Sequence, residues 1–153
     1  MSDLTAERLA AAHQALRSGD RERALEYWHP DVRFQSPGNH PYAGWHDGLD
    51  AFMGFIKTWQ RLAGGTLRME QIACLVNPVD GYTIDVNRCT AVRKRTGSDG
   101  TSFYEHLQME GVDLMRWENG RVVEGRGGIF GDGTANFSSF FGPIGPDGVR
   151  SDD

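Results

Sequence analysis

Cysteine is scarce in this chain, which carries only Cys74 and Cys89 among its 153 residues. The two do not form the closely spaced pair that a zinc site uses. Two isolated thiols in a chain of this length are typical of a reducing compartment, where they serve as small buried side chains. We therefore expect a cytoplasmic protein.

Long apolar runs and an excess of positive charge are also missing. No run approaches the roughly 18 apolar residues that a membrane span requires, and residues 1–4 lack the basic and apolar regions of a signal peptide. Lys and Arg number 16 against 21 Asp and Glu, a formal net charge of −5. The densest basic run, at 93–95, adjoins a predicted turn, where solvated charge is the ordinary explanation. We expect neither a membrane nor a nucleic acid as a partner.

Several catalytic motifs are absent as well. There is no Gly-x-Ser-x-Gly elbow, no phosphate-binding Gly-Lys-Ser/Thr loop and no His-Glu-x-x-His string. The glycine-rich run at 125–128 follows no strand-to-helix switch, which excludes a dinucleotide fingerprint. The five histidines are spread without metal-ligand spacing. We therefore expect a site without a metal and without a cofactor.

The segments that are present change from helical to strand-like periodicity along the chain. Helices are predicted over about 3–17, after Asp20, and from Asp47 to the Gly64-Gly65 pair. Ser2 or Asp3 is expected to cap the first helix and Gly19 to end it, while Asp20 and Asp47 are expected to cap the second and third. A short strand is predicted at 32–34. Four longer strands are predicted near 66–77, 81–95, 102–117 and 121–130, and their short separators imply an antiparallel meander.

This order of elements predicts an α+β fold, in which a curved, mostly antiparallel sheet wraps around the N-terminal helices. We expect a single domain over 1–153, with a core at about 4–130 and a Gly/Pro-rich tail at 131–153. The aromatic cluster of the tail, Phe137, Phe140 and Phe141, is expected to pack on its own domain or across a dimer.

Asp113 is the most informative side chain. It precedes an Asn119-Gly120 hairpin turn and alternates with Met109 and Leu107 on a mostly apolar strand face. On an exposed face it would be an ordinary solvated charge. On an inward face burial would raise its pKa, so that the neutral acid could donate a hydrogen bond or a proton to a substrate oxygen.

Five strings and their order resemble the nuclear-transport-factor-2-like superfamily, and within it the ketosteroid isomerase and SnoaL-like group. The strings are Ser-Gly-Asp at 18–20, Trp-His-Pro-Asp-Val-Arg-Phe at 28–34, Ala-Gly-Trp-His-Asp-Gly at 43–48, Asp-Leu-Met-Arg-Trp at 113–117 and Asn-Gly-Arg-Val at 119–122. The resemblance covers about residues 4–130. It implies a cone-shaped domain with an interior apolar pocket, often paired into a homodimer.

The resemblance carries only one catalytic group to this chain. Asp113 falls where ketosteroid isomerases keep the protonated aspartic acid of their oxyanion hole. Their general base position is Ser36 here, and their oxyanion tyrosine falls on Ala12, with His13 one residue away. A structural role is the expectation for His13. The general base is therefore left unidentified.

Other candidate site residues surround this acid. His40, in the loop after Ser36, is a candidate second catalytic group. Arg88 could face inward and bind a carboxylate or a polarised epoxide. Gly125 and Gly127 replace larger side chains of the family, which indicates either a sheet bend or a pocket enlarged for a bulky ligand. The candidate pocket walls, each of which could equally be plain core, are Phe34, Tyr42, Phe55, Trp59 and Met109.

These observations favour a cofactor-independent acid–base enzyme that isomerises, cyclises or dehydrates a hydrophobic cyclic or polyketide-like small molecule. One alternative is a non-catalytic small-molecule-binding or dimerisation module of the same fold. A second is an activity like that of the related limonene epoxide hydrolases, although their catalytic carboxylates fall on Thr90 and Gly127.

Overall fold

The computed structural model describes residues 4–130, 140–143 and 146. Helices and strands follow one another as α1 (Ala6–Ser18), α2 (Arg21–Ala24), β1 (Trp28–Ser36), β2 (Gly44–Asp47), α3 (Leu49–Leu62), β3 (Arg68–Asn77), β4 (Tyr82–Thr96), β5 (Ser102–Glu118) and β6 (Arg121–Ile129). The strands form one six-stranded sheet in the order β2-β1-β6-β5-β4-β3. β1 and β6 run parallel, and every other neighbouring pair is antiparallel.

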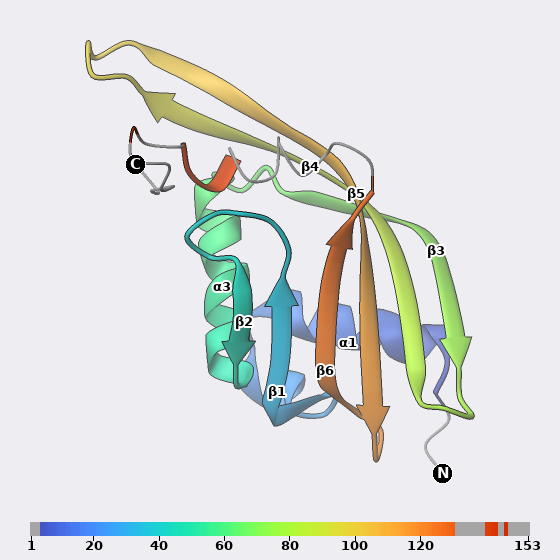
Figure 1. The fold of residues 1–153 in the computed structure, drawn as a ribbon. Coiled ribbons are helices and arrows are strands. Elements are labelled where there is room, and N and C mark those ends of the chain that lie inside the picture. Colours follow the sequence, from blue (N-terminus) through green and yellow to red (C-terminus); the bar gives the residue numbers. More distant parts are fainter. Residues whose placement is uncertain (1–3, 131–139, 144–145, 147–153) are drawn as a thin grey trace.

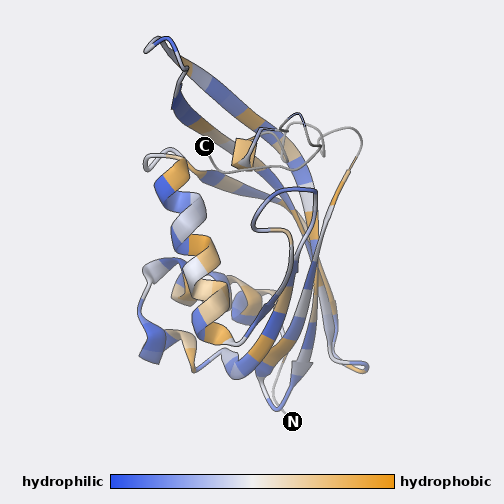
Figure 2. Cartoon of the chain, turned by 60° about the vertical axis from the view of Figure 1, so that its left-hand side comes forward, coloured by the Kyte–Doolittle hydropathy of each residue, from blue (hydrophilic) through white to orange (hydrophobic). Residues whose placement is uncertain are grey.

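The sheet is strongly curved and open, and α1 and α3 lie on its hollow side (Figure 1). β4 and β5 continue past the other strands as a long hairpin that reaches over the end of α3. Figure 2 shows the same layers from another side, and the buried residues of α3 are Leu49, Phe52, Phe55 and Trp59. None of the helices in the described part of the chain has both the length and the hydropathy of a bilayer-spanning segment.

The four long strands of the meander and the α+β class are confirmed, because strand-type alternation and turn residues mark these segments clearly. The caps at Asp20 and Gly19 are also confirmed: the Asp20 carboxylate accepts hydrogen bonds from two backbone N–H groups, and Gly19 takes a left-handed conformation with φ 74°. The cap of α1 was placed wrongly, since Thr5 and not Ser2 or Asp3 accepts the backbone hydrogen bond.

The region around β1 and β2 differs most from expectation. β1 runs from Trp28 to Ser36, and Pro30 lies within it. Asp47 does not cap α3; it ends β2 and pairs with Arg33 of β1, with 2.6 Å between Nε and Oδ1. Residues 44–47 form a strand only because they pair with β1. The segment is short, and its apolar and polar residues do not alternate as those of a typical strand do.

Aromatic packing joins the helices to the sheet. The Phe34 ring stacks on that of Phe52 at 4.3 Å, and Trp28 meets Phe52 edge-on at 5.4 Å. The indole N–H of Trp28 donates to the carbonyl of Ala12 at 2.9 Å, which ties β1 to α1. This contact holds the N-terminal helix across one side of the hollow.

Other residues of the protein pack closely against the strand glycines Gly125 and Gly127. A Cβ on Gly125 would lie 2.7 Å from Phe34 Cδ2 and 2.8 Å from Met115 Sδ. A Cβ on Gly127 would lie 2.8 Å from Pro37 Cδ. The interpretation of an enlarged pocket is therefore not supported at Gly125, where Phe34 and Met115 fill the space, whereas Gly127 lines the cavity beside Pro37.

The described part of the tail closes one end of the hollow. Phe140 and Phe141 are fully buried, so both pack on their own domain, whereas Phe137 lies outside the described residues. The buried guanidinium of Arg93 donates to the carbonyls of Phe140 and Phe141 at 2.6 and 2.9 Å, and Arg95 donates to that of Phe140 at 3.0 Å. The long hairpin thus holds the end of the chain.

Gly125→Ala should lower the free energy of unfolding by about 1–3 kcal/mol, because the added methyl group overpacks against Phe34 and Met115. Gly54→Ala is the matched control: nothing lies within 4 Å of its would-be Cβ in α3, and alanine should stabilise the helix by about 0.5–1 kcal/mol. Urea unfolding of both variants checks this. A neutral Gly125→Ala would contradict the close packing of β6.

Candidate functional site

A cavity of about 860 Å³ lies between α1, α3 and the concave face of the sheet. Its volume suits a small organic molecule. Of the predicted walls, Phe34, Phe55, Trp59 and Met109 line this cavity, together with Phe52, Ile56 and Met115. The polar side chains that line it include His13, Ser36, Asn87 and Asp113. The cavity therefore combines an apolar wall with a few polar groups.

Asp113 faces this cavity from β5, as its alternation with buried Met109 and Met115 requires. Burial, and then the negative charge of Asp85, raise the pKa of Asp113 to about 7. Within the described residues no group donates a hydrogen bond to its carboxyl. Asp113 is therefore a carboxyl group that keeps a proton close to neutral pH and has no hydrogen-bond partner in the described part of the chain.

Asp85 lies directly opposite Asp113 in the register of β4 and β5. Its side chain is buried, and its two oxygens accept hydrogen bonds from Gln71 Nε2 at 2.5 Å and Asn87 Nδ2 at 2.7 Å. These two amides stabilise a buried negative charge. The sequence does not single out this residue, because it does not show which face of the strand at 81–95 points inward. The alternation of Thr83, Asp85 and Asn87 is the signal that could have found it.

His13 of α1 completes this cluster. Its Nε2 lies 3.4 Å from Asp85 Oδ2, and its ring meets Trp28 edge-on. Burial lowers the pKa of His13, the charge of Asp85 opposes that shift, and Arg17 adds to it. The imidazole is therefore neutral near pH 7. The sequence predicts a structural role for His13, but in the structure this residue lies on the cavity wall, next to Asp85.

Two further polar groups line the cavity. Ser36, at the general base position of the resembling enzymes, is buried, and its hydroxyl has no hydrogen-bond partner within the described chain. A serine hydroxyl cannot act as a base by itself. Burial, with smaller contributions from Asp113 and Asp85, raises the pKa of the Cys89 thiol to about 12, so that this cysteine is no nucleophile at neutral pH.

His40 does not reach the cavity, so its predicted catalytic role is not supported by its position. Its Nδ1 accepts a hydrogen bond from the backbone N–H of Tyr42 at 3.2 Å, and its Nε2 lies 3.0 Å from the carbonyl of Pro37. The ring stacks on Phe141 at 4.2 Å. Tyr42, a predicted wall, lies beside this stack and outside the cavity lining. Both residues hold the loop and the tail together.

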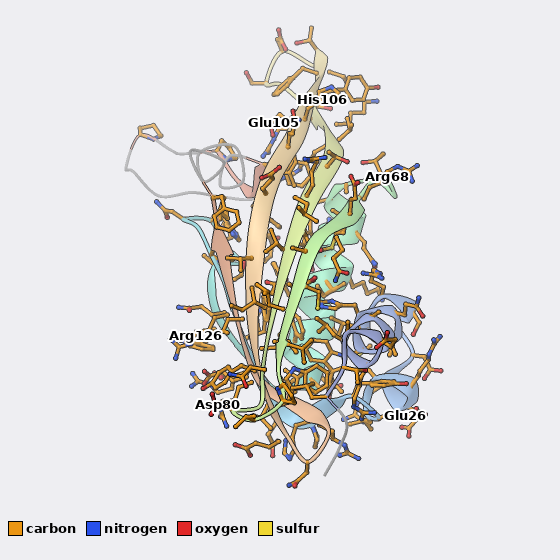
Figure 3. The ribbon with its side chains drawn as sticks, turned by 90° about the vertical axis from the view of Figure 1, so that its right-hand side faces the viewer. Glu26, Arg68, Asp80, Glu105, His106 and Arg126 are labelled. Atoms are coloured by element: carbon orange, nitrogen blue, oxygen red, sulfur yellow. The ribbon has the colours of Figure 1, made fainter. Side chains whose placement is uncertain are left out.

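Arg88, a candidate for substrate binding whose facing the sequence leaves open, borders the cavity, but its guanidinium is engaged on the exposed face of the sheet. Its guanidinium pairs with Glu110 at 3.1 Å and with Glu70 at 3.7 Å, on the exposed face of β4 and its neighbours. Figure 3 views the sheet along its edge and shows Arg126 on the side away from the helices. Among the described residues, no three His, Cys, Asp or Glu side chains are grouped as metal ligands.

Solved structures with the same fold share most of their length with this chain. Bal32a, from a soil-derived mobile gene cassette, is 25% identical with a TM-score of 0.72, and the match covers 88% of this chain and 94% of Bal32a. TerC co-crystallised with polyporic acid is 18% identical with a TM-score of 0.62, over 88% of this chain and 95% of TerC.

IdmH from Streptomyces antibioticus, a putative polyketide cyclase, is 15% identical with a TM-score of 0.63, over 86% of this chain and 96% of IdmH. At such identities TerC and IdmH support the fold alone. No curated protein matched. The family model of the SnoaL-like domain matches residues 9–125, which is most of the chain. The chain therefore belongs to the SnoaL-like domain family.

Proposed function

We propose that this protein is a cofactor-independent acid–base enzyme that isomerises, cyclises or dehydrates a hydrophobic cyclic or polyketide-like molecule. One observation carries the proposal: Asp113 presents a carboxyl group with a strongly raised pKa to an apolar cavity, and no described residue occupies its hydrogen-bonding capacity. A carboxyl group with a strongly raised pKa on a cavity wall is a candidate functional group.

Asp113 would act as hydrogen-bond donor or general acid. Its O–H would donate to a carbonyl oxygen of the substrate and stabilise the negative charge that develops when the neighbouring carbon loses a proton. The apolar walls strengthen this interaction because they exclude water. The resemblance to ketosteroid isomerases implies the same role at this position.

The family and the neighbouring structures support the substrate class. SnoaL-like membership and the putative polyketide cyclase IdmH agree with a cyclic or polyketide-like molecule. TerC was crystallised with polyporic acid, which makes a small organic acid a reasonable probe for the cavity.

A binding module without catalysis is the second candidate function. Ala12 and Ser36 stand where the resembling enzymes have a tyrosine and a general base, and neither supplies that chemistry. Epoxide hydrolysis is not favoured, because Thr90 is exposed and Gly127 has no side chain and contacts Pro37.

We also propose that the protein forms a homodimer through the outer face of its sheet. Leu75, Ile84 and Leu114 lie in one row across β3, β4 and β5, on the face opposite Asp85 and Asp113. Leu75 and Leu114 are 61% and 37% exposed. An apolar row on a solvent face is a common feature of an interface.

The two free thiols are in keeping with the cytoplasm.

Asp113→Asn should stabilise the protein at both pH values, and by about 2–3 kcal/mol more at pH 8 than at pH 5, where only the first part of the loss has occurred. The pKa of Asp113 rises from 3.8 to about 7 on folding, so its contribution to stability is present below pH 4 and is lost as the pH rises through 7. The variant avoids that loss, which amounts to as much as about 4 kcal/mol. Urea unfolding at both pH values measures it, with exposed Glu110→Gln of the same strand as control. Equal effects at the two pH values would contradict a neutral Asp113.

A thermal-shift screen of the wild type against polyporic acid, phenols, polyketide lactones and steroids should identify at least one class that raises the melting temperature. For a compound that is also turned over, Asp113→Asn should lower kcat about 10²–10⁴-fold, whereas Glu110→Gln should not. Binding without turnover of any compound would favour the non-catalytic module. Full turnover by Asp113→Asn would exclude the acid role.

The wild type should sediment with the mass of two chains, and Leu75→Glu should produce a single-chain species by placing a charge in the apolar row. Val79→Glu is the control, since Val79 is 90% exposed at the turn between β3 and β4 and lies off the row. A dimer that persists in Leu75→Glu would place the interface elsewhere.

A further inference from the structure

We propose that His13 is the proton acceptor of this cavity and that Asp85 positions it. This inference rests on the proposed acid–base function and deepens it, because it supplies the base that the resemblance leaves unassigned. Three elements bring the groups together: α1 carries His13, β4 carries Asp85 and β5 carries Asp113. Asp85 contacts His13 and lies opposite Asp113 in the strand register.

The contact with Asp85 selects one tautomer of the imidazole. His13 Nε2 is buried and lies 3.4 Å from Asp85 Oδ2, and no described residue other than Asp85 offers it an acceptor. A carboxylate oxygen can only accept, so Nε2 carries the proton in this pair. The separation is longer than a hydrogen bond, as is common in a catalytic pair before the substrate tightens it.

With the proton on Nε2, the other ring nitrogen holds a lone pair. Nδ1 has no hydrogen-bond partner among the described residues and is not among the fully buried atoms. The ring lines the cavity, and the His13 side chain is 13% exposed. Nδ1 is therefore a free acceptor on the wall of an apolar cavity. An orienting carboxylate behind a histidine is the arrangement that hydrolases use to hold a base in its active tautomer.

The charges around His13 suit a base that starts neutral. Burial and the Arg17 charge disfavour the imidazolium, while Asp85 favours it. Once His13 has accepted a proton, the imidazolium faces the negative charge of Asp85, which stabilises it. Burial, and then the charge of Asp85, raise the pKa of Asp113 as well, which favours its neutral acid form. The charge of Asp85 thus favours the protonated form of both His13 and Asp113.

The reaction step balances within this cluster. Nδ1 of His13 takes a proton from a carbon next to a substrate carbonyl, and the C–H electron pair forms a carbon–carbon double bond. The carbonyl π pair moves to oxygen, which takes the proton of Asp113. The products are an enol, an imidazolium and a carboxylate. In a β,γ-unsaturated ketone this enol is conjugated with the second double bond. The γ-carbon then takes the His13 proton with the electrons of that double bond, and the remaining double bond shifts to the α,β position. The enol O–H returns its proton to the Asp113 carboxylate as the carbonyl re-forms, which completes an isomerisation and restores both side chains.

Nitrogen NMR of the ¹⁵N-histidine-labelled protein tests the tautomer without any substrate. At pH 7.5 the His13 ring should show a protonated Nε2 and an unprotonated Nδ1, and the signal is identified by its loss in His13→Gln. Asp85→Asn should remove the preference for this tautomer. A protonated Nδ1, or a doubly protonated ring at pH 7.5, would overturn the proposal even if Asp113 proves to be an acid.

Proton exchange of 2-tetralone in D₂O, followed by ¹H NMR, tests the chemistry with a small apolar ketone. The wild type should accelerate loss of the α-proton signals over buffer, and His13→Gln should reduce this acceleration at least 100-fold, as removal of a general base does. Gln14→Ala, the exposed neighbour on α1, is the control and should exchange like the wild type.

The variants separate this inference from the proposed function. Loss of exchange in Asp113→Asn but not in His13→Gln would keep the acid and overturn the base. Loss in His13→Gln but not in Asp113→Asn would support the base and overturn the acid. A wild type without any acceleration would overturn both. The rate of proton exchange is also measured against pH. If Asp85→Asn shifts the low-pH part of this profile, the result supports a positioning role for Asp85. An unchanged profile would exclude that role.

Discussion

A single buried negative charge, that of Asp85, is the constraint on which the chemistry of the cavity depends. An anion in an apolar interior costs several kcal/mol unless donors surround it, and Gln71 and Asn87 supply those donors from the same sheet. With one charge so placed, a second one beside it becomes unfavourable. Burial raises the pKa of Asp113 most, and the Asp85 charge raises it further, while the same carboxylate lies 3.4 Å from Nε2 of His13.

The fold around this charge follows from simple patterns. Alternating strands separated by turn residues and an amphipathic α3 were predictable from local sequence, because each pattern is contained within about fifteen residues. β2 was not predictable in this way, since its four residues become a strand only by pairing with β1. The start of α1 depended on which of several nearby polar residues caps it, and the sequence offers more than one.

The site was predictable only in part, and the division has a physical reason. Asp113 could be found because its own strand shows which face it occupies. The role of Asp85 depends on which face of a different strand points inward. The role of His13 depends on how α1 crosses the sheet. No local sequence pattern predicts either of these features. His40 and Arg88 illustrate the converse: each looked suitable by type, but tertiary contacts direct His40 to the tail and Arg88 to the outer face.

The attachment of the tail has a consequence for the order of events during synthesis. Arg93 and Arg95 leave the ribosome more than forty residues before the Phe140 and Phe141 carbonyls to which they donate. The sheet and helices can form first, but one end of the hollow stays open until the last segment has been translated and docked. A nascent chain paused before residue 140 would therefore expose the rings of Phe55 and Trp59, a surface on which chaperones act.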